Sequence, residues 1–303
     1  EINPKIIAAY QPMQGLQGPH RDFLGFGGVL APISGLSHLS GNPDRLPFGV
    51  GTNYPDYALN PGHTVIAIVA ALRHRERTGQ GQMVELAQIE SVASTLGPAL
   101  LDYSVNDRVQ MRAGNRSSWM APHGVYRCLD ETRSYPSEPG QDPEARERWI
   151  ALAVGNDAEW SALCEVAGAA SFADDDRFAT ILDRRAYEDA LDSALGEWTA
   201  SQSASELELK LQAAGVSAGL VHDAEDMLNH DTHLAERGYY AYLDHPETGR
   251  SAYDGPVARL SETPGELDAP APLLGEQTFR VATEILGYSE DEVGELVALG
   301  VLT

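Results

Sequence analysis

The sequence predicts an α/β protein, because short apolar strand patterns alternate with helices that have clear start and stop signals. Strand patterns occur at residues 6–10, 83–87, 149–154 and 216–221, with helical patterns between them. The chain has 303 residues, of which 43% are hydrophobic. This is enough to bury a full core in one large or two modest domains.

The first predicted strand, at 6–10, runs into a loop rich in glycine, proline and glutamine at 11–19. Loops that follow strands are where α/β folds place their ligands, so this loop is a candidate binding segment. A plain glycine turn explains the same residues equally well.

Residues 54–82, YPDYALNPGHTVIAIVAALRHRERTGQGQ, contain the best-marked helix. Asn60 is a good N-cap and Pro61 a good first helical residue, since proline lacks the N–H that would be unpaired there. An apolar run predicts that this helix is buried. The run is formed by Val65, Ile66, Ile68, Val69 and Leu72. Asp56 precedes the helix, where free backbone N–H groups and the positive dipole end favour an ionised carboxylate. Asp56 is therefore a candidate nucleophile, although a Pro-Asp pair before a helix is also common turn chemistry.

Two more helices are predicted in the first half of the chain. Residues 23–41 are apolar and rich in small side chains, which suggests a tightly packed helix flanked by glycines. Residues 88–103 predict an amphipathic helix. Its buried side is expected to consist of Ile89, Val92, Leu96, Leu100 and Leu101. A loop rich in glycine, serine and proline then runs into a short strand within 113–128.

Residues 125–222 predict a small α/β domain inserted in the larger fold. The strands WIALAV and VSAGLV enclose several capped helices, and the hydrophilic stretch 132–148 is expected to be a surface excursion. Beyond residue 222, turn-rich segments separate short strands. The chain ends in two helices, and Ser289 with Glu292 predicts a capping box.

The charge balance limits the possible partners. A formal net charge of −24 argues against nucleic acid or an anionic membrane surface, because polyphosphate binding needs a basic field. No run reaches the ~20 apolar residues that span a bilayer, and no signal peptide is evident, so a cytoplasmic location is the default. The two cysteines and the isolated His63 and His123 lack metal-site spacing, so no metal is expected.

Several separated motifs resemble the family III CoA-transferases, the formyl-CoA and carnitine CoA-transferase (CaiB/BaiF) superfamily. The helix exit ERTGQGQ followed by the strand MVELA is similar to the family's core, and the chain endings PLLGE and LGYS are similar as well. The resemblance implies a large Rossmann-like domain at 1–124 that lacks its N-terminal segment, and the small domain at 125–222. It also implies a return crossing at 223–303 whose C-terminal helices pack on the large domain.

The resemblance assigns Asp56 as the covalent nucleophile, because family members carry an aspartate just before the matching helix. The chain looks one residue longer here than the formyl-CoA type, so an ungapped alignment would put Tyr57 at that position. A tyrosine cannot form the acyl anhydride. We therefore place the gap between Asp56 and the helix and take Tyr57 as a substrate contact.

Other binding residues are also implied by the resemblance. Gln14, Gly15 and Gly18 loosely match a GxxGP loop beside the family's active site. In the formyl-CoA type, a run of glycines in the linker near residue 117 covers that site. This chain has SSWMA there, so a bulkier and less mobile lid is expected. Its candidate substrate or CoA contacts are Asn115, Arg116, Ser117, Ser118 and Trp119. Simple packing of Trp119 is the alternative.

The implied function is transfer of CoA from an acyl-CoA to a carboxylic acid through aspartyl anhydride and aspartyl-CoA thioester intermediates. No permanent cofactor is needed, and the phosphates of CoA would require a local basic patch, for which 74–77 and 108–116 are candidates. Related α-methylacyl-CoA racemases carry Gly-His-Asp where this chain has Gly25-Phe26-Gly27, and phenylalanine cannot accept a proton. Racemisation is therefore the less favoured alternative to CoA transfer.

The other alternative is a non-catalytic subunit or fragment of a CoA-transferase. The resemblance implies a nucleotide-binding segment ahead of residue 1, and no GxGxxG motif in this chain replaces it. Either the sequence is a fragment, or those contacts come from another polypeptide. Family members are intertwined dimers, so a homodimer or a partner chain that supplies the segment is expected.

Overall fold

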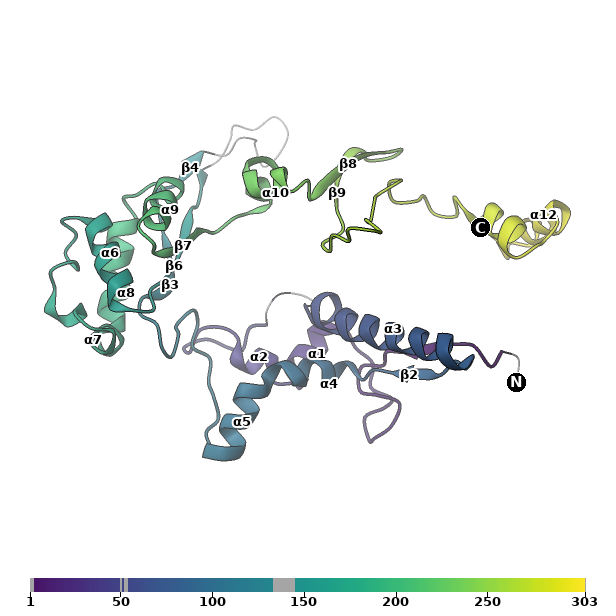
Figure 1. Cartoon of the computed structure of the whole chain (residues 1–303), viewed down its shortest axis with the longest axis horizontal. Helices are drawn as coiled ribbons and strands as arrows, with labels where there is room; N and C mark the ends of the chain where they lie inside the picture. The colour runs from purple at the N-terminus through teal and green to yellow at the C-terminus, as the bar shows by residue number, and fades with distance from the viewer. Residues whose placement is uncertain (1–2, 50, 52–53, 133–144, 303) are drawn as a thin grey trace. The chain divides into compact units, whose positions relative to one another are not determined.

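The computed structural model describes residues 3–49, 51, 54–132 and 145–302. The chain divides into two compact units, Glu1–Leu220 and Val221–Thr303 (Figure 1). This division lies beside the predicted boundary at residue 222. The predicted boundary at 124 falls inside the first unit and stays a prediction, as does the packing of the C-terminal helices on the large domain.

The first unit begins with a parallel pair of strands, β1 (Ala8–Tyr10) and β2 (Met83–Glu85). Ala8 lies opposite Met83 and Tyr10 opposite Glu85. Parallel strands need a long crossover, which here contains helical segments. These are α1 (Gly27–Ile33), α2 (Leu36–Leu39), the π-helical turn η1 (Pro55–Leu59) and α3 (Asn60–Thr78). The predicted strands at 6–10 and 83–87 are confirmed.

The expected start of the main helix is wrong. Asn60 is not an N-cap, because the backbone is already helical at Tyr54 and passes through η1 into α3 without a break. Pro55 takes the place among the first helical residues that the sequence analysis gave to Pro61, and it lacks an N–H for the same reason. Asp56 therefore lies inside the first helical turn and not ahead of the helix.

The expected burial of this helix is also wrong. Ala71 is fully buried, but Val65, Ile66 and Val69 are 57–71% exposed. Within the described residues, α3 packs against η1, α4 and β2. An apolar run this broad covers more of the helix surface than those neighbours reach.

The two other helices predicted in this region, at 23–41 and 88–103, are each divided into shorter helices. Gly35, with φ 92°, separates α1 from α2, since glycine adopts the left-handed conformation without strain. The segment 88–103 divides into α4 (Gln88–Ala93), a 3₁₀ turn η2 (Ser94–Leu96) and α5 (Gly97–Asn106). The break precedes Pro98, which has no N–H to continue the helix. Leu100 and Leu101 are exposed, contrary to the prediction.

A three-stranded antiparallel sheet forms the small α/β region, in the order β3 (His123–Arg127), β6 (Trp149–Ala153) and β7 (Ser217–Leu220). Helices pack a continuous apolar core against it. They are α6 (Asp157–Ala167), η3 (Asp176–Phe178), α8 (Glu188–Thr199) and α9 (Ala204–Ala213), and α7 (Ile181–Ala186) packs against η3 and α8. The strands predicted at 149–154 and 216–221 are confirmed. In the excursion predicted at 132–148, the short pair β4 (Glu131–Thr132) and β5 (Ala145–Arg146) is described, and residues 133–144 lie outside the described residues.

Arg184 is a fully buried charge at the centre of this region. Its guanidinium donates to the carbonyl oxygen of Ala121 at 2.8 Å and of Phe178 at 3.1 Å, and to the Asp157 carboxylate at 2.8 Å. It also lies 4.9 Å from the ring centroid of Trp160. Arg184 thus joins helix α7, the start of α6 and the end of the loop before β3.

We expect Arg184→Met to lower the free energy of unfolding by about 3 kcal/mol, because it leaves buried carbonyl groups without donors. The neighbouring Arg185 is exposed, so the control Arg185→Met should stay within about 0.5 kcal/mol of wild type. Chemical denaturation of both variants measures the difference. Equal stability of the two variants would contradict the role assigned to Arg184.

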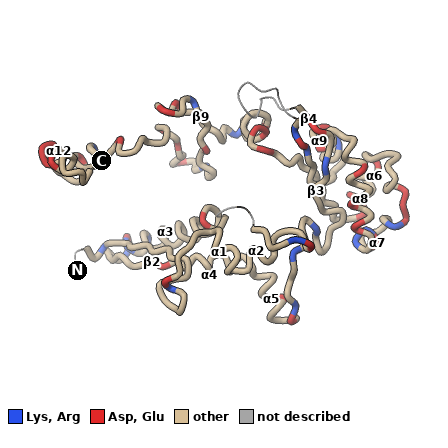
Figure 2. The backbone as a smooth tube through the Cα atoms, turned by 180° about the vertical axis from the view of Figure 1, so that it is seen from behind, with Lys and Arg blue, Asp and Glu red and all other residues tan. Residues whose placement is uncertain are grey.

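The second unit contains the antiparallel hairpin β8 (Tyr240–His245) and β9 (Gly249–Asp254), preceded by η4 (Asp226–His230) and α10 (Thr232–Glu236). It ends in α11 (Thr278–Arg280), η5 (Val281–Ile285) and α12 (Glu290–Ala298). The predicted capping box of Ser289 and Glu292 is confirmed, and acidic residues occupy the first turn of this helix (Figure 2). No helix among the described residues is both long and apolar enough to cross a bilayer.

Candidate functional site

Asp56 is held by a backbone donor from a distant part of the chain. Its Oδ2 accepts the N–H of Gly27, the first residue of α1, at 2.7 Å. The side chain is half-buried in η1, beside Pro55, which is fully buried. One carboxylate oxygen is therefore fixed by a hydrogen bond, and the group is only partly withdrawn from solvent.

The donor residue, Gly27, belongs to the Gly25-Phe26-Gly27 triplet, where the related racemases carry a histidine. Gly27 follows Phe26, which is 77% exposed and has an extended backbone at the N-terminus of α1. A phenyl ring, which cannot exchange a proton, therefore stands next to the residue that binds Asp56. The sequence analysis considered this triplet only for its missing histidine and did not foresee that it would supply the hydrogen-bond donor.

The glycine loop after β1 shares a small core with the Asp56 turn. Met13 packs with Leu30 of α1 and Val92 of α4, and Leu59 of η1 packs against the same cluster. Gly15, with φ 91°, is buried against Glu85 and Ala87, and the N–H of Leu16 donates to the Glu85 carboxylate at 2.5 Å. The structure therefore anchors the loop that carries Gln14 to the apolar cluster behind Asp56.

Gln14 is half-buried, whereas Gly18 lies on the exposed side of this loop, also with positive φ. Tyr57 is 79% exposed on η1. Their roles in substrate binding stay predictions.

The linker before β3 is pinned to the small α/β region. The Ala121 N–H donates to the carbonyl oxygen of Val154, and the Val154 N–H donates to the carbonyl oxygen of Pro122. At its start, the N–H of Gly114 donates to the carbonyl oxygen of Gly41 at 2.9 Å. The lid role of this linker and its reduced mobility stay predictions. No hydrogen bond or ion pair among the described residues joins Asn115, Arg116, Ser117, Ser118 or Trp119 to Asp56.

Arg116 is bound by acidic side chains of α8. Its guanidinium lies 2.6 Å from Asp189 and 2.7 Å from Asp192, and it faces the half-buried Glu188 at 3.8 Å. Hydrogen bonds to Asp192 and Asp189 raise the pKa of Arg116, while burial raises the pKa of Glu188. An arginine surrounded by three carboxylates is poorly suited to a phosphate. The geometry favours a structural link between the linker and α8.

Around this linker lie two cavities. One, of about 400 Å³, is lined by Asn115, Arg116 and Asp192 among others, and the second, of about 650 Å³, by Asn115 and the small side chains of the β6–β7 face. Both have the size of small-molecule sites. His123 lines both cavities and donates its Nδ1 hydrogen to the carbonyl oxygen of Asn115.

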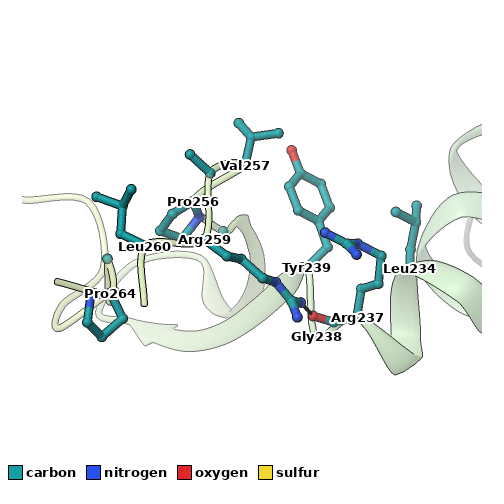
Figure 3. Close-up of a pocket in the computed structure, with 12 residues that line it drawn as sticks. Leu234, Arg237, Gly238, Tyr239, Pro256, Val257, Arg259, Leu260 and Pro264 are labelled. Atoms are coloured by element: carbon teal, nitrogen blue, oxygen red, sulfur yellow. Dashed lines mark hydrogen bonds between the residues drawn. The ribbon is translucent and has the colours of Figure 1, made fainter. Parts of the chain in front are cut away.

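A cavity of about 500 Å³ lies in the second unit (Figure 3). Two guanidinium groups, of Arg237 and Arg259, line it together with the apolar side chains of Leu234, Tyr239 and Val257. No acidic residue is among the lining residues, and Arg259 donates to the carbonyl oxygen of Arg237. Sequence analysis missed this pair, because residues 237 and 259 meet only through the β8–β9 hairpin.

Comparison with known proteins gives the class of protein to which this fold belongs. Residues 1–278 match the family described as CoA-transferase family III. The chain therefore belongs to CoA-transferase family III, and the predicted fold class is confirmed.

Individual relatives agree with this assignment. The chain is 29% identical over 301 residues to succinyl-CoA–D-citramalate CoA-transferase of Chloroflexus aurantiacus, covering 99% of this chain and 70% of that protein. It is 29% identical over 294 residues to the alpha subunit of succinyl-CoA–L-malate CoA-transferase of the same species, covering 97% of this chain and 65% of the relative. A crystal structure of a CAIB/BAIF family protein from Brucella suis superposes with a TM-score of 0.78 and 26% identity, over 93% of this chain and 68% of that one. The chain thus spans between 65% and 70% of the length of these relatives.

Proposed function

We propose that this chain carries the nucleophile of an acyl-CoA:carboxylate CoA-transferase and that the nucleophile is Asp56. The observation that carries the proposal is the half-buried carboxylate on η1, held by the N–H of Gly27 at 2.7 Å. A carboxylate whose one oxygen is fixed by a backbone donor keeps its second oxygen free for attack. Membership of CoA-transferase family III supports the choice of reaction.

The first half of the proposed reaction removes the acyl group from CoA. A carboxylate oxygen of Asp56 attacks the acyl carbon of the thioester, the C–S bond breaks, and CoA leaves as the thiolate. The thiolate then attacks the Asp56 carbonyl carbon of the resulting anhydride. The donor acid leaves as its carboxylate, and Asp56 now carries CoA as a thioester.

The second half reverses these steps with the acceptor acid. Its carboxylate attacks the Asp56 carbonyl carbon and releases the CoA thiolate, which gives a second anhydride. The thiolate attacks the acceptor's acyl carbon, so that the Asp56 carboxylate is regenerated and a new acyl-CoA departs. No proton or electron is gained or lost overall. Backbone N–H groups such as that of Gly27 are suited to stabilise the oxyanions that form on the Asp56 carbonyl.

The names of the two curated relatives support a substrate class. Both act on succinyl-CoA and on a hydroxylated dicarboxylic acid, citramalate or malate. We propose that this chain likewise uses short dicarboxylic acids, which keep one free carboxylate when the other becomes a thioester. The name of the second relative includes a subunit, which supports assembly with a further chain or a second copy.

Two alternatives make different predictions. A racemase would wash solvent deuterium into the α-carbon of an acyl-CoA without any acceptor acid, and the exposed Phe26 beside Gly27 disfavours this. A non-catalytic subunit would fail to bind CoA on its own, and a co-purified chain would restore binding.

Substitution of Asp56 tests the nucleophile. Asp56→Ala should lower CoA transfer by about 10⁴-fold or more, because the covalent route is lost, while the exposed Asp22→Ala control keeps wild-type activity. Hydroxylamine added during turnover should modify Asp56 alone, as read by peptide mass spectrometry. Near-normal turnover of the Asp56 variant would reject the proposal.

We propose that the cavity in the second unit binds an anionic group of the substrates, either a CoA phosphate or a carboxylate. Arg237 and Arg259 make no ion pair among the described residues, although the chain carries 45 acidic residues against 21 basic ones. Unpaired guanidinium groups against apolar walls bind oxyanions through charge-assisted hydrogen bonds.

We expect Arg259→Ala and Arg237→Ala each to raise the KM of the anionic substrate bound there by about tenfold, the loss of one charged hydrogen bond. Arg250→Ala is the matched control, because Arg250 lies over the Tyr242 ring of the same hairpin and does not line the cavity. Initial rates with acyl-CoA and acid varied separately identify the affected substrate. Unchanged KM values for both substrates would exclude the cavity.

A further inference from the structure

The turn that carries Asp56 has an unusual form. In η1, the N–H of Asn60 donates to the carbonyl oxygen of Pro55, five residues earlier, where an α-helix would use a residue four earlier. A π-turn therefore accommodates one more residue than an α-helical turn.

A single π-turn is less favourable than a continuous α-helix, so it persists where its surroundings hold it. If the turn relaxed to α-helical geometry, the residues before it would shift around the helix axis by one position. Asp56 would then no longer face the N–H of Gly27. The position of the carboxylate therefore depends on whatever fixes η1.

The side chain of Asn60 supplies this fixation. It is 1% exposed at the junction of η1 and α3, and its Oδ1 accepts the hydroxyl of Ser91, which is 3% exposed on α4. The backbone N–H of Asn60 closes the π-turn, and its side chain binds a separate helix. One residue thus ties the turn to α4 from inside the protein.

The polar character of this contact argues for a role beyond packing. Among the described residues, Asn60 Nδ2 is buried without a hydrogen-bond partner. A buried amide that satisfies only part of its hydrogen-bonding capacity costs stability, which an apolar side chain of similar size would avoid. The directional bond to Ser91 is what an apolar side chain cannot replace.

We infer that Asn60 and Ser91 are positioning residues, which hold η1 in its π form and thereby aim the Asp56 carboxylate at its substrate. This inference rests on the proposed function, because it concerns the same nucleophile. A reacting oxygen displaced by about 1 Å loses roughly a hundredfold in rate. Removal of the pair should therefore lower kcat while leaving substrate binding nearly unchanged.

The test compares two serines of the same region. Ser91→Ala and Asn60→Leu should each lower kcat by about 10- to 100-fold with KM within about threefold of wild type. Ser94→Ala is the matched control. The Ser94 hydroxyl donates to the backbone carbonyl oxygen of Ser91 at 2.7 Å, whereas the Ser91 hydroxyl reaches the side chain of Asn60. The control should keep wild-type kcat.

The double variant Asn60→Leu/Ser91→Ala separates positioning from stability. It replaces both polar partners by apolar groups, so its melting temperature should stay near that of wild type. Its kcat should remain as low as that of the single variants, because the two residues act as one unit. A double variant with wild-type kcat, or an equal loss in Ser94→Ala, would overturn the inference.

Asp56→Ala measured in the same assay separates this inference from the proposed function. If Asp56→Ala retains transfer, the proposed nucleophile is wrong and the inference falls with it. If Asp56 is essential but the double variant turns over normally, only the positioning role is rejected.

Discussion

The hydrogen bond from the Gly27 N–H to the Asp56 carboxylate is the constraint around which the first unit is arranged. It joins the first residue of α1 to the turn before α3, which are separated by 28 residues of chain. For the two to meet, α1, η1 and α4 must share the core formed by Met13, Leu30 and Val92. The start of α1 at Gly27 serves this geometry, because a continuous helix over 23–41 could not present a free N–H at residue 27.

The two folded regions of unit 1 use charge in different ways. In the small α/β region, Arg184 and Arg116 are each bound by carbonyl or carboxylate groups, so their charges serve structure. The Asp56 carboxylate accepts the backbone N–H of Gly27 and makes no ion pair among the described residues, and the neutral side chains of Asn60 and Ser91 tie its turn to α4. A neutral surrounding leaves a carboxylate free to become an uncharged anhydride or thioester without breaking an ion pair.

The strongly acidic composition explains why basic residues could not be assigned from sequence. Runs such as 108–116 look like phosphate-binding patches, yet Arg108 is paired with Asp102 and Arg116 with the acids of α8. With more than twice as many acidic as basic residues, an arginine in such a run readily finds a carboxylate. Arg237 and Arg259, which line one cavity and make no ion pair among the described residues, come from positions that no local pattern relates to each other.

The sequence by itself determined the main strands, most helices of the small α/β region and the capping box, because periodicity, caps and motifs are local properties. It also led to the proposal of Asp56 as the nucleophile. Only the tertiary structure decided where long helices break, which side of α3 is covered, and that Pro55 begins the helix expected at Pro61. It alone also joined Gly27 and Ser91 to the turn of Asp56. These features depend on contacts between residues some thirty positions apart, which no pattern within one segment can encode.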